Sequence, residues 1–214
     1  MPCNHKFKPV LTLDRIDFEP TTLIVGTFIP EWPASNTAGW FYGRTRDAAG
    51  NRCNNFWDIL PGIYGEPGLI DATPHEWKLF CQRKQIAFTD LISSIDDADP
   101  GSPEHNKILA GSSDDAIAWN FEDFSFVNIV QLLRHHATIK NVYLTRGITE
   151  SFWRHLWNPV MQYCSLNNLH ERRLLTPSGL PLYQHSAHNN ENPGDVIPLL
   201  EDYILMRWKQ DWHL

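Results

Sequence analysis

The sequence predicts an α/β fold in which helices cover both faces of a central, mostly parallel sheet, a three-layer α/β/α arrangement. Apolar, β-branched runs alternate with segments of helical spacing, and this alternation is typical of parallel sheets. The chain has 214 residues, which is enough for one domain with a substantial core. We therefore expect a single domain over residues 1–214, with residues 1–20 as an N-terminal arm that carries a basic cluster of His5, Lys6 and Lys8.

Three apolar segments are expected to form the strands of this sheet. Residues 21–28 begin with Thr-Thr-Leu-Ile-Val and break at Gly26, and residues 86–92 and 139–145 are the second and third segments. Pro177-Ser178-Gly179 is a turn signal between two short extended stretches, residues 172–176 and 180–185. We interpret these stretches as one further β element, a hairpin.

Helices are expected at residues 55–60, 73–84, 124–136, 149–166 and 194–210. The second helix has the clearest start, because Thr73 suits the N-cap, Pro74 the first helical position and Glu76 the first turn. Pro159 is expected to kink or divide the fourth helix. Residues 93–113 are polar, and we interpret part of them as a surface excursion.

One rim of the expected sheet has the character of a ligand site. Ligands of open α/β sheets bind beyond the carboxyl ends of the strands. The segments expected there are polar or glycine-rich: residues 26–30, 90–94, 145–147 and the polar loop 185–190. The first of them opens a long loop with Trp40, Phe41 and Tyr42, and loops of this length are usually functional or disordered. The aromatic content argues against disorder.

Composition argues against several classes of protein, although a local basic face stays open. The net charge of −7 does not fit a tight, non-specific nucleic-acid binder, which carries a basic footprint. No apolar run approaches the roughly 18 residues of a membrane span, and the first residues lack the apolar core of a signal peptide, so we expect a cytoplasmic protein with no membrane contact. The four cysteines are dispersed without a close pair, which favours free buried thiols over a zinc, dithiol or iron–sulfur site.

Four sequence blocks together resemble the uracil-DNA glycosylase superfamily, most closely its hypoxanthine-DNA glycosylase and mismatch-specific uracil-DNA glycosylase branch. They run in the family's order and cover roughly residues 23–190. The first block is Gly26-Thr27-Phe28, and the second joins Phe41-Tyr42-Gly43 to Asn54-Asn55-Phe56-Trp57. The third joins residues 89–94 to 111–117, and the fourth joins residues 139–147 to His185-Ser186-Ala187-His188.

The resemblance implies a uracil-DNA-glycosylase-like fold and a base excision repair enzyme. Such an enzyme flips a deaminated base, uracil or hypoxanthine, out of DNA and hydrolyses its N-glycosidic bond. It would be monofunctional, without metal or cofactor, and we favour a monomer with DNA as its partner. By its place in the second block Asn54 would position the water, and His185 would donate a hydrogen bond to the departing base.

The resemblance also assigns the rest of the site. Substrate contacts are expected from Gly26, Thr27, Phe28, Phe41, Tyr42, Asp90, Thr145, Ser186 and His188, and phosphate contacts from Arg44, Arg46, Arg146 and Ser112. The expected slot for one nucleobase is walled by Phe28 and Tyr42. Structural roles stay open beside these: core packing for the aromatic residues, helix capping for Asn54, and loop bracing for Asp90.

Two other functions stay open as well. The chain could have the fold without the chemistry and bind damaged or abasic DNA. It could instead act on a free nucleoside or nucleotide, which would need no basic DNA footprint.

Overall fold

The computed structural model describes residues 1–214 apart from residues 48, 112 and 214. Its centre is a four-stranded parallel sheet in the order β3-β2-β6-β7. These strands are Thr22–Gly26 (β2), Ile86–Asp90 (β3), Asn141–Leu144 (β6) and His170–Arg173 (β7). Gly26 pairs with Asp90, and Val25 pairs with Leu144, so β2, β3 and β6 end at the same edge.

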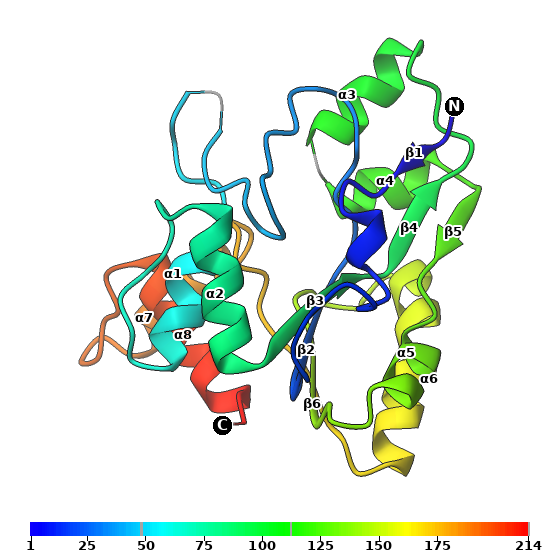
Figure 1. The fold of residues 1–214 in the computed structure, drawn as a ribbon. Helices are drawn as coiled ribbons and strands as arrows, with labels where there is room; N and C mark the ends of the chain where they lie inside the picture. Colours follow the sequence, from blue (N-terminus) through cyan, green and yellow to red (C-terminus); the bar gives the residue numbers. More distant parts are fainter. Residues whose placement is uncertain (48, 112, 214) are drawn as a thin grey trace.

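Helices cover both faces of this sheet, which confirms the three-layer α/β/α arrangement (Figure 1). One face carries α1 (Phe56–Ile63), α2 (Pro74–Lys84), α7 (Leu182–Glu191) and α8 (Leu200–Asp211), and the other carries α5 (Ile129–His135) and α6 (Ser151–Leu166). Successive side chains of a strand point to opposite faces. Accordingly, Ile24 packs in the core with Trp57 and Trp208, while Val25 packs in the core with Trp157.

A second, antiparallel sheet lies beside the first and was not expected from the sequence. Its order is β1-β4-β5, formed by Cys3–Asn4 (β1), Ile92–Ile95 (β4) and Phe124–Phe126 (β5). Strands of two to four residues are too short to show a periodic pattern. The single helix expected at residues 124–136 is therefore wrong in its first part, and α5 begins only after Asn128, whose side chain accepts a hydrogen bond from the Gln131 amide.

The polar excursion holds two short helices, α3 (Pro103–Gly111) and α4 (Asp114–Asn120). The Ser113 side chain caps α4 by accepting a hydrogen bond from the Ala116 amide. In the N-terminal arm, Lys8–Val10 forms a 3-10 helix (η1). The basic cluster expected in that arm is wrong, because His5 is buried and its ring bonds inward to a carboxylate.

The expected hairpin after residue 170 is wrong. β7 joins the parallel sheet beside β6, and the stretch expected as a second strand and a polar loop forms α7. Tertiary contacts hold α7 in place: the His185 ring lies 2.6 Å from the Ile197 carbonyl oxygen and stacks on Tyr203 of α8. Helix α2 begins as expected, with a reciprocal capping box between Thr73 and Glu76.

Proline does not divide α6, since Pro159 lies inside the continuous helix 151–166. The last helix starts at Leu200, six residues later than residue 194 where it was expected. Among the described residues, none of the helices combines the length and the hydropathy that a membrane crossing requires.

Candidate functional site

Gly26 is the point where three segments of the chain meet at the carboxyl edge of the sheet. A Cβ atom at this position would collide with Oδ1 of Asp90 and lie 2.9 Å from the phenol oxygen of Tyr42. Only glycine leaves room for both groups. The end of β2 therefore lies beside a carboxylate from β3 and a phenol from the loop that contains Trp40, Phe41 and Tyr42, which we call the aromatic loop.

Tyr42 is held tightly in this space. Its backbone has a φ of 55°, a left-handed conformation that costs a non-glycine residue about 1–2 kcal/mol. Its ring stacks on Phe56 with a centroid distance of 3.8 Å and an interplanar angle of 5°. Its phenol oxygen lies 2.8 Å from the Thr145 hydroxyl at the end of β6. These contacts offset the backbone strain and fix the direction of the phenol.

The phenol of Tyr42 keeps its proton at neutral pH. Burial raises its pKa well above 10, and the negative charge of Asp90 raises it further, while the hydrogen bond with Thr145 acts in the opposite direction. The Thr145 hydroxyl also lies 3.4 Å from the Val25 carbonyl oxygen, to which it can donate. Tyr42 can then donate its proton to Thr145 or to a ligand.

His5 and Asp90 form a buried pair beside Gly26. His5 Nε2 lies 2.7 Å from Asp90 Oδ2, and both side chains are almost fully buried. The backbone amide of Phe7 donates to His5 Nδ1 at 2.9 Å, so Nε2 carries the hydrogen that Asp90 accepts. This leaves Asp90 Oδ1, the oxygen nearest Gly26, without a bond to the histidine.

Sequence reasoning missed His5 as a member of the site. The pair spans 85 residues, and the arm is attached through β1 and through a bridge between His5 and Pro30. The local sequence around His5 resembles a solvated basic segment. Its burial follows from the edge-on and tilted packing of its ring against Phe28 and Phe41, at 5.7 and 5.6 Å.

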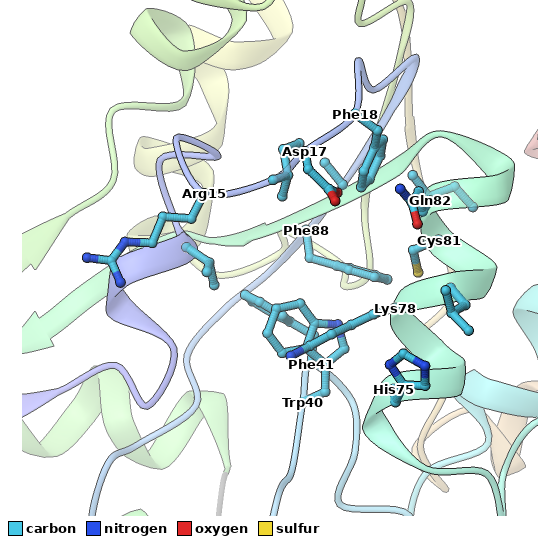
Figure 2. Close-up of a pocket in the computed structure, with 15 residues that line it drawn as sticks. Arg15, Asp17, Phe18, Trp40, Phe41, His75, Lys78, Cys81, Gln82 and Phe88 are labelled. Carbon is cyan, nitrogen blue, oxygen red and sulfur yellow. The ribbon is translucent and has the colours of Figure 1, made fainter.

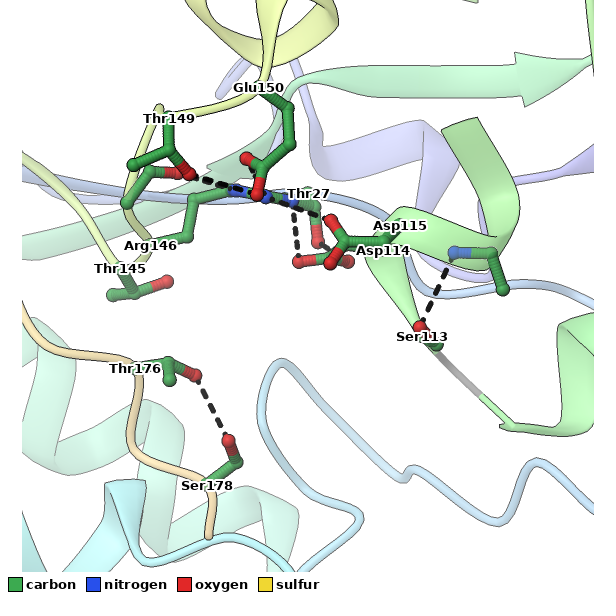
Figure 3. Close-up of polar contacts among 12 residues, drawn as sticks. Thr27, Ser113, Asp114, Asp115, Thr145, Arg146, Thr149, Glu150, Thr176 and Ser178 are labelled. Carbon is green, nitrogen blue, oxygen red and sulfur yellow. Dashed lines mark hydrogen bonds and ion pairs between the residues drawn. The ribbon is translucent and has the colours of Figure 1, made fainter. Parts of the chain in front are cut away.

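Arg146 sits on the other flank of the edge, in a network of carboxylates (Figure 3). Its guanidinium lies 3.0 Å from Asp114, 3.3 Å from Asp115 and 3.1 Å from Glu150. It also stacks over the Trp153 ring at 4.1 Å. One arginine therefore faces three carboxylates, and this flank carries net negative charge.

Asp114 links the network to β2. The Thr27 hydroxyl donates to Asp114 Oδ1 at 2.5 Å. Burial raises the pKa of Asp114, while the hydrogen bond from Thr27 and the charge of Arg146 act to lower it. Since about a third of the Asp114 side chain is exposed, water weakens these influences on its pKa.

Asn54 stands at the start of α1. Its Oδ1 accepts a hydrogen bond from the Phe56 amide at 2.8 Å, and its backbone bridges to Ser178. The neighbouring Asn55 is the N-cap residue of α1, and its side-chain oxygen is buried without a hydrogen-bond partner among the described residues. The side chain that binds a free amide at the start of α1 is therefore that of Asn54, and this bond uses one lone pair of its oxygen.

The remaining expected site residues are dispersed. Phe28 and Phe41 are buried, and Phe41 stacks on Phe88 at 5.4 Å. His185, Ser186 and His188 lie on α7, where Ser186 donates to the Leu182 carbonyl and His188 packs against Tyr203. The polar loop expected over these residues is wrong, because they form a helix.

The arginines of the aromatic loop have protein contacts of their own. Arg44 donates to the Ala110 carbonyl at 2.8 Å, and Arg46 pairs with Asp71 at 3.0 Å. Ser112 lies outside the described residues. Two hollows of the described chain are lined neither by Asn54 nor by Tyr42. At the edge itself Gly26 and Asp90 are buried, whereas Tyr42 is partly exposed.

Comparison with known proteins gives one structural neighbour. No family model matches the sequence, and no curated protein matches it either. Among solved structures, the fold is similar to the solution NMR structure of a Methanosarcina acetivorans protein that carries the provisional name uracil DNA glycosylase. The two share 13% sequence identity over 88% of this chain and 93% of the other, with a TM-score of 0.48. The chemistry of the site is therefore inferred from its own residues.

Proposed function

We propose that the chain hydrolyses the N-glycosidic bond of a deaminated base, uracil or hypoxanthine, flipped out of DNA. The supporting observation is the meeting of Gly26, Tyr42, Asp90 and Thr145 at one edge of the sheet. Each comes from a different one of the four blocks that resemble the uracil-DNA glycosylase superfamily. Residues far apart in the sequence thus converge where an open α/β sheet binds its ligand.

The pair of His5 and Asp90 gives this edge a carboxylate suited to the reaction. Hydrolysis of a glycosidic bond passes through an oxocarbenium-like transition state. His5 holds Asp90 Oδ2, which leaves Oδ1 to accept a proton from water or to stabilise the cationic sugar. His5 acts through Asp90 and is a positioning residue.

The leaving base needs hydrogen-bond donors on the opposite side. The hydrogen bond between the Tyr42 phenol and the Thr145 hydroxyl uses one of their two hydrogens and leaves the other hydroxyl to donate to the base. Donors aimed at a developing negative charge are typically the largest source of rate acceleration. Asn54 would add a water contact through the free lone pair of its oxygen or through its amide group.

A flipped base must reach a carboxylate that is buried in this structure. Asp90 is buried, and the Tyr42 ring is covered on one face by Phe56. A flipped base could stack on the other face of Tyr42, and such stacking contributes ~1–3 kcal/mol per base. Movement of the loop that carries Tyr42 would expose this face.

The test is the release of free base from oligonucleotides that carry one uracil or one hypoxanthine, as duplexes and as single strands. We expect wild-type protein to release base, Asn54→Ala to release it more slowly, and an undamaged duplex to release none. If no substrate releases base above the buffer blank, the proposed glycosylase activity is wrong. Binding to the damaged duplex without release would identify a protein that recognises the lesion but lacks the chemistry.

A free nucleoside or nucleotide is the second candidate substrate, and the charge around the edge favours it. Arg146 is matched by three carboxylates, and the whole chain has a net charge of −7. DNA affinity falls steeply with salt when several phosphates are contacted. A steep salt dependence of base release would support the DNA substrate, while a flat dependence with turnover of free nucleoside would support the second candidate.

A further inference from the structure

A cavity of about 400 Å³ lies between α2, β3 and the N-terminal segment of the chain (Figure 2). It is lined neither by Tyr42 nor by Asp90, so it is distinct from the edge at Gly26. Its volume is at the lower end of the range for small-molecule sites, roughly 300–1,000 Å³. It can hold a ligand the size of a nucleotide but not a polymer.

Aromatic rings form much of the cavity wall. Phe18, Trp40, Phe41 and Phe88 all line it, from three separate segments of the chain. Such rings present flat π faces, and planar ligands gain stacking energy against them. The wall therefore favours a planar heterocycle over a flexible aliphatic ligand.

Two polar side chains without a protein partner among the described residues lie at one end of the cavity. Figure 2 shows the Asp17 carboxylate and the Gln82 amide directed to the space between Phe18 and Phe88. Within the described part of the chain, Asp17 has no ion pair and Gln82 has no side-chain hydrogen bond. A carboxylate accepts two or more hydrogen bonds, and an amide both donates and accepts.

Positive groups stand toward the other end. The Lys78 ammonium lies 4.2 Å from the centre of the Trp40 ring, and Arg15 reaches outward from the side opposite Gln82 (Figure 2). Neither of these cations forms an ion pair with any residue that the structure describes. The Trp40 indole nitrogen is buried and also lacks an acceptor among those residues. Donors and positive charge are thus available for an anionic group.

We propose that this cavity binds an adenine nucleotide. Glutamine matches the neighbouring donor and acceptor on the adenine edge, and a carboxylate accepts from an exocyclic amino group. Gln82 and Asp17 would read that edge while the base stacks between Phe18 and Phe88. Lys78 would receive the phosphate, to which a cationic side chain forms charge-assisted hydrogen bonds.

Calorimetric titration of the full chain with AMP, adenosine, adenine and UMP tests the proposal. We expect AMP to bind more tightly than adenosine, and UMP to bind at least about tenfold more weakly than AMP because its edge presents a different pattern. Lys78→Ala should lower the affinity for AMP and leave that for adenosine nearly unchanged. If AMP does not bind at concentrations up to about 1 mM, where even a weak specific complex would form, the proposal is overturned.

Variants locate the bound nucleotide. Asp17→Asn and Leu79→Trp alter exposed residues that line the cavity, so the fold should tolerate both. We expect Asp17→Asn to weaken AMP binding about tenfold, the loss of one hydrogen bond to a charged group. The bulky indole of Leu79→Trp should obstruct the cavity and weaken binding further.

Asp14→Asn is the matched control, since Asp14 is an exposed carboxylate of the same segment that does not line the cavity. It should bind AMP as wild type does. If Asp17→Asn and Leu79→Trp also bind AMP like wild type, the nucleotide lies elsewhere and the proposal is wrong. Base release by Asp17→Asn should match wild type, which separates this test from that of the proposed glycosylase.

Discussion

The phenol oxygen of Tyr42 lies 2.8 Å from the hydroxyl oxygen of Thr145, beside the position that a side chain on Gly26 would occupy. This contact joins the aromatic loop to the end of β6. It also holds the Tyr42 hydroxyl beside the space that Asp90 faces from β3. The arrangement depends on a glycine, on a tyrosine whose backbone is in the left-handed conformation, and on a buried carboxylate.

The absence of a side chain at Gly26 is the first feature to test. In Gly26→Ala the added methyl group would displace the Asp90 carboxylate or the Tyr42 phenol. Overpacking of this kind costs about 1–3 kcal/mol. We expect chemical denaturation to show that loss. Gly147→Ala is the control, because a Cβ at Gly147 meets no atom within 4 Å, and equal stability of the two variants would contradict the close approach.

The buried pair of His5 and Asp90 predicts a large effect of removing the imidazole. His5→Ala leaves the Asp90 carboxylate buried without the donor that holds Oδ2. A buried acceptor left without its donor typically costs about 1–3 kcal/mol, and more when the acceptor is charged. We expect the free energy of unfolding at pH 7 to fall by that order, while His135→Ala, on an exposed site of α5, should change it little. A loss below about 1 kcal/mol, the value for an exposed pair, would show that the pair is solvated.

Arg146 is expected to hold the fold together rather than to contact phosphate. Arg146→Met would leave three carboxylates near one another without a cation. The carboxylates are partly exposed, so we expect a loss of about 1–3 kcal/mol, between the values for surface and buried pairs. Thermal unfolding measures it, with Arg173→Met at an exposed position of β7 as the control. Unchanged stability together with a smaller salt dependence of DNA binding would instead assign Arg146 to phosphate contact.

Asp96 predicts a pH dependence of stability. The Ser125 hydroxyl on β5, followed by that of Ser94 on β4, holds the pKa of Asp96 below its usual value. The folded-state pKa is therefore lower than the unfolded one, so this contribution is present above about pH 4, the unfolded pKa, and is lost as the pH falls through the folded pKa.

Ser125→Ala should raise the pKa of Asp96 toward its ordinary value, as followed by NMR titration of the carboxyl carbon. Because Asp96 is exposed, the accompanying loss of stability at neutral pH should stay below about 1 kcal/mol and vanish in acid. The exposed Ser35→Ala serves as the control. An Asp96 pKa that does not move would show that the hydroxyl of Ser125 does not hold the carboxylate in solution.

Three of the four parallel strands, β2, β3 and β6, and helices such as α2 were accessible from the sequence because their signals are local. The β-branched run before Gly26 and the Thr73–Glu76 capping box specify a strand and a helix start without distant partners. Helix α7 was not accessible in this way. Its sequence combines Tyr, His, Ser and Asn residues of weak helix propensity. The helix is stabilised by contacts of His185 and Asn189 with the segment around Ile197.

In the site, too, local sequence signals could place some residues, while only tertiary packing places the others. Gly26, Asp90 and Thr145 could be placed at one edge because each ends an expected strand. His5 could not, since only tertiary packing of the arm brings it to Asp90. The charge around Arg146 was equally hidden, because its partners come from α4 and from the turn before α6.

The rate of base release by Asp90→Asn in a single turnover is the most direct test of the proposed active site. The substitution keeps the shape of the side chain and removes its charge and basicity. General-base catalysis contributes roughly 10²–10⁴-fold, so we predict a loss of at least about 100-fold in rate in a protein whose circular dichroism spectrum matches wild type. A folded Asp90→Asn variant that releases base at the wild-type rate would contradict the account.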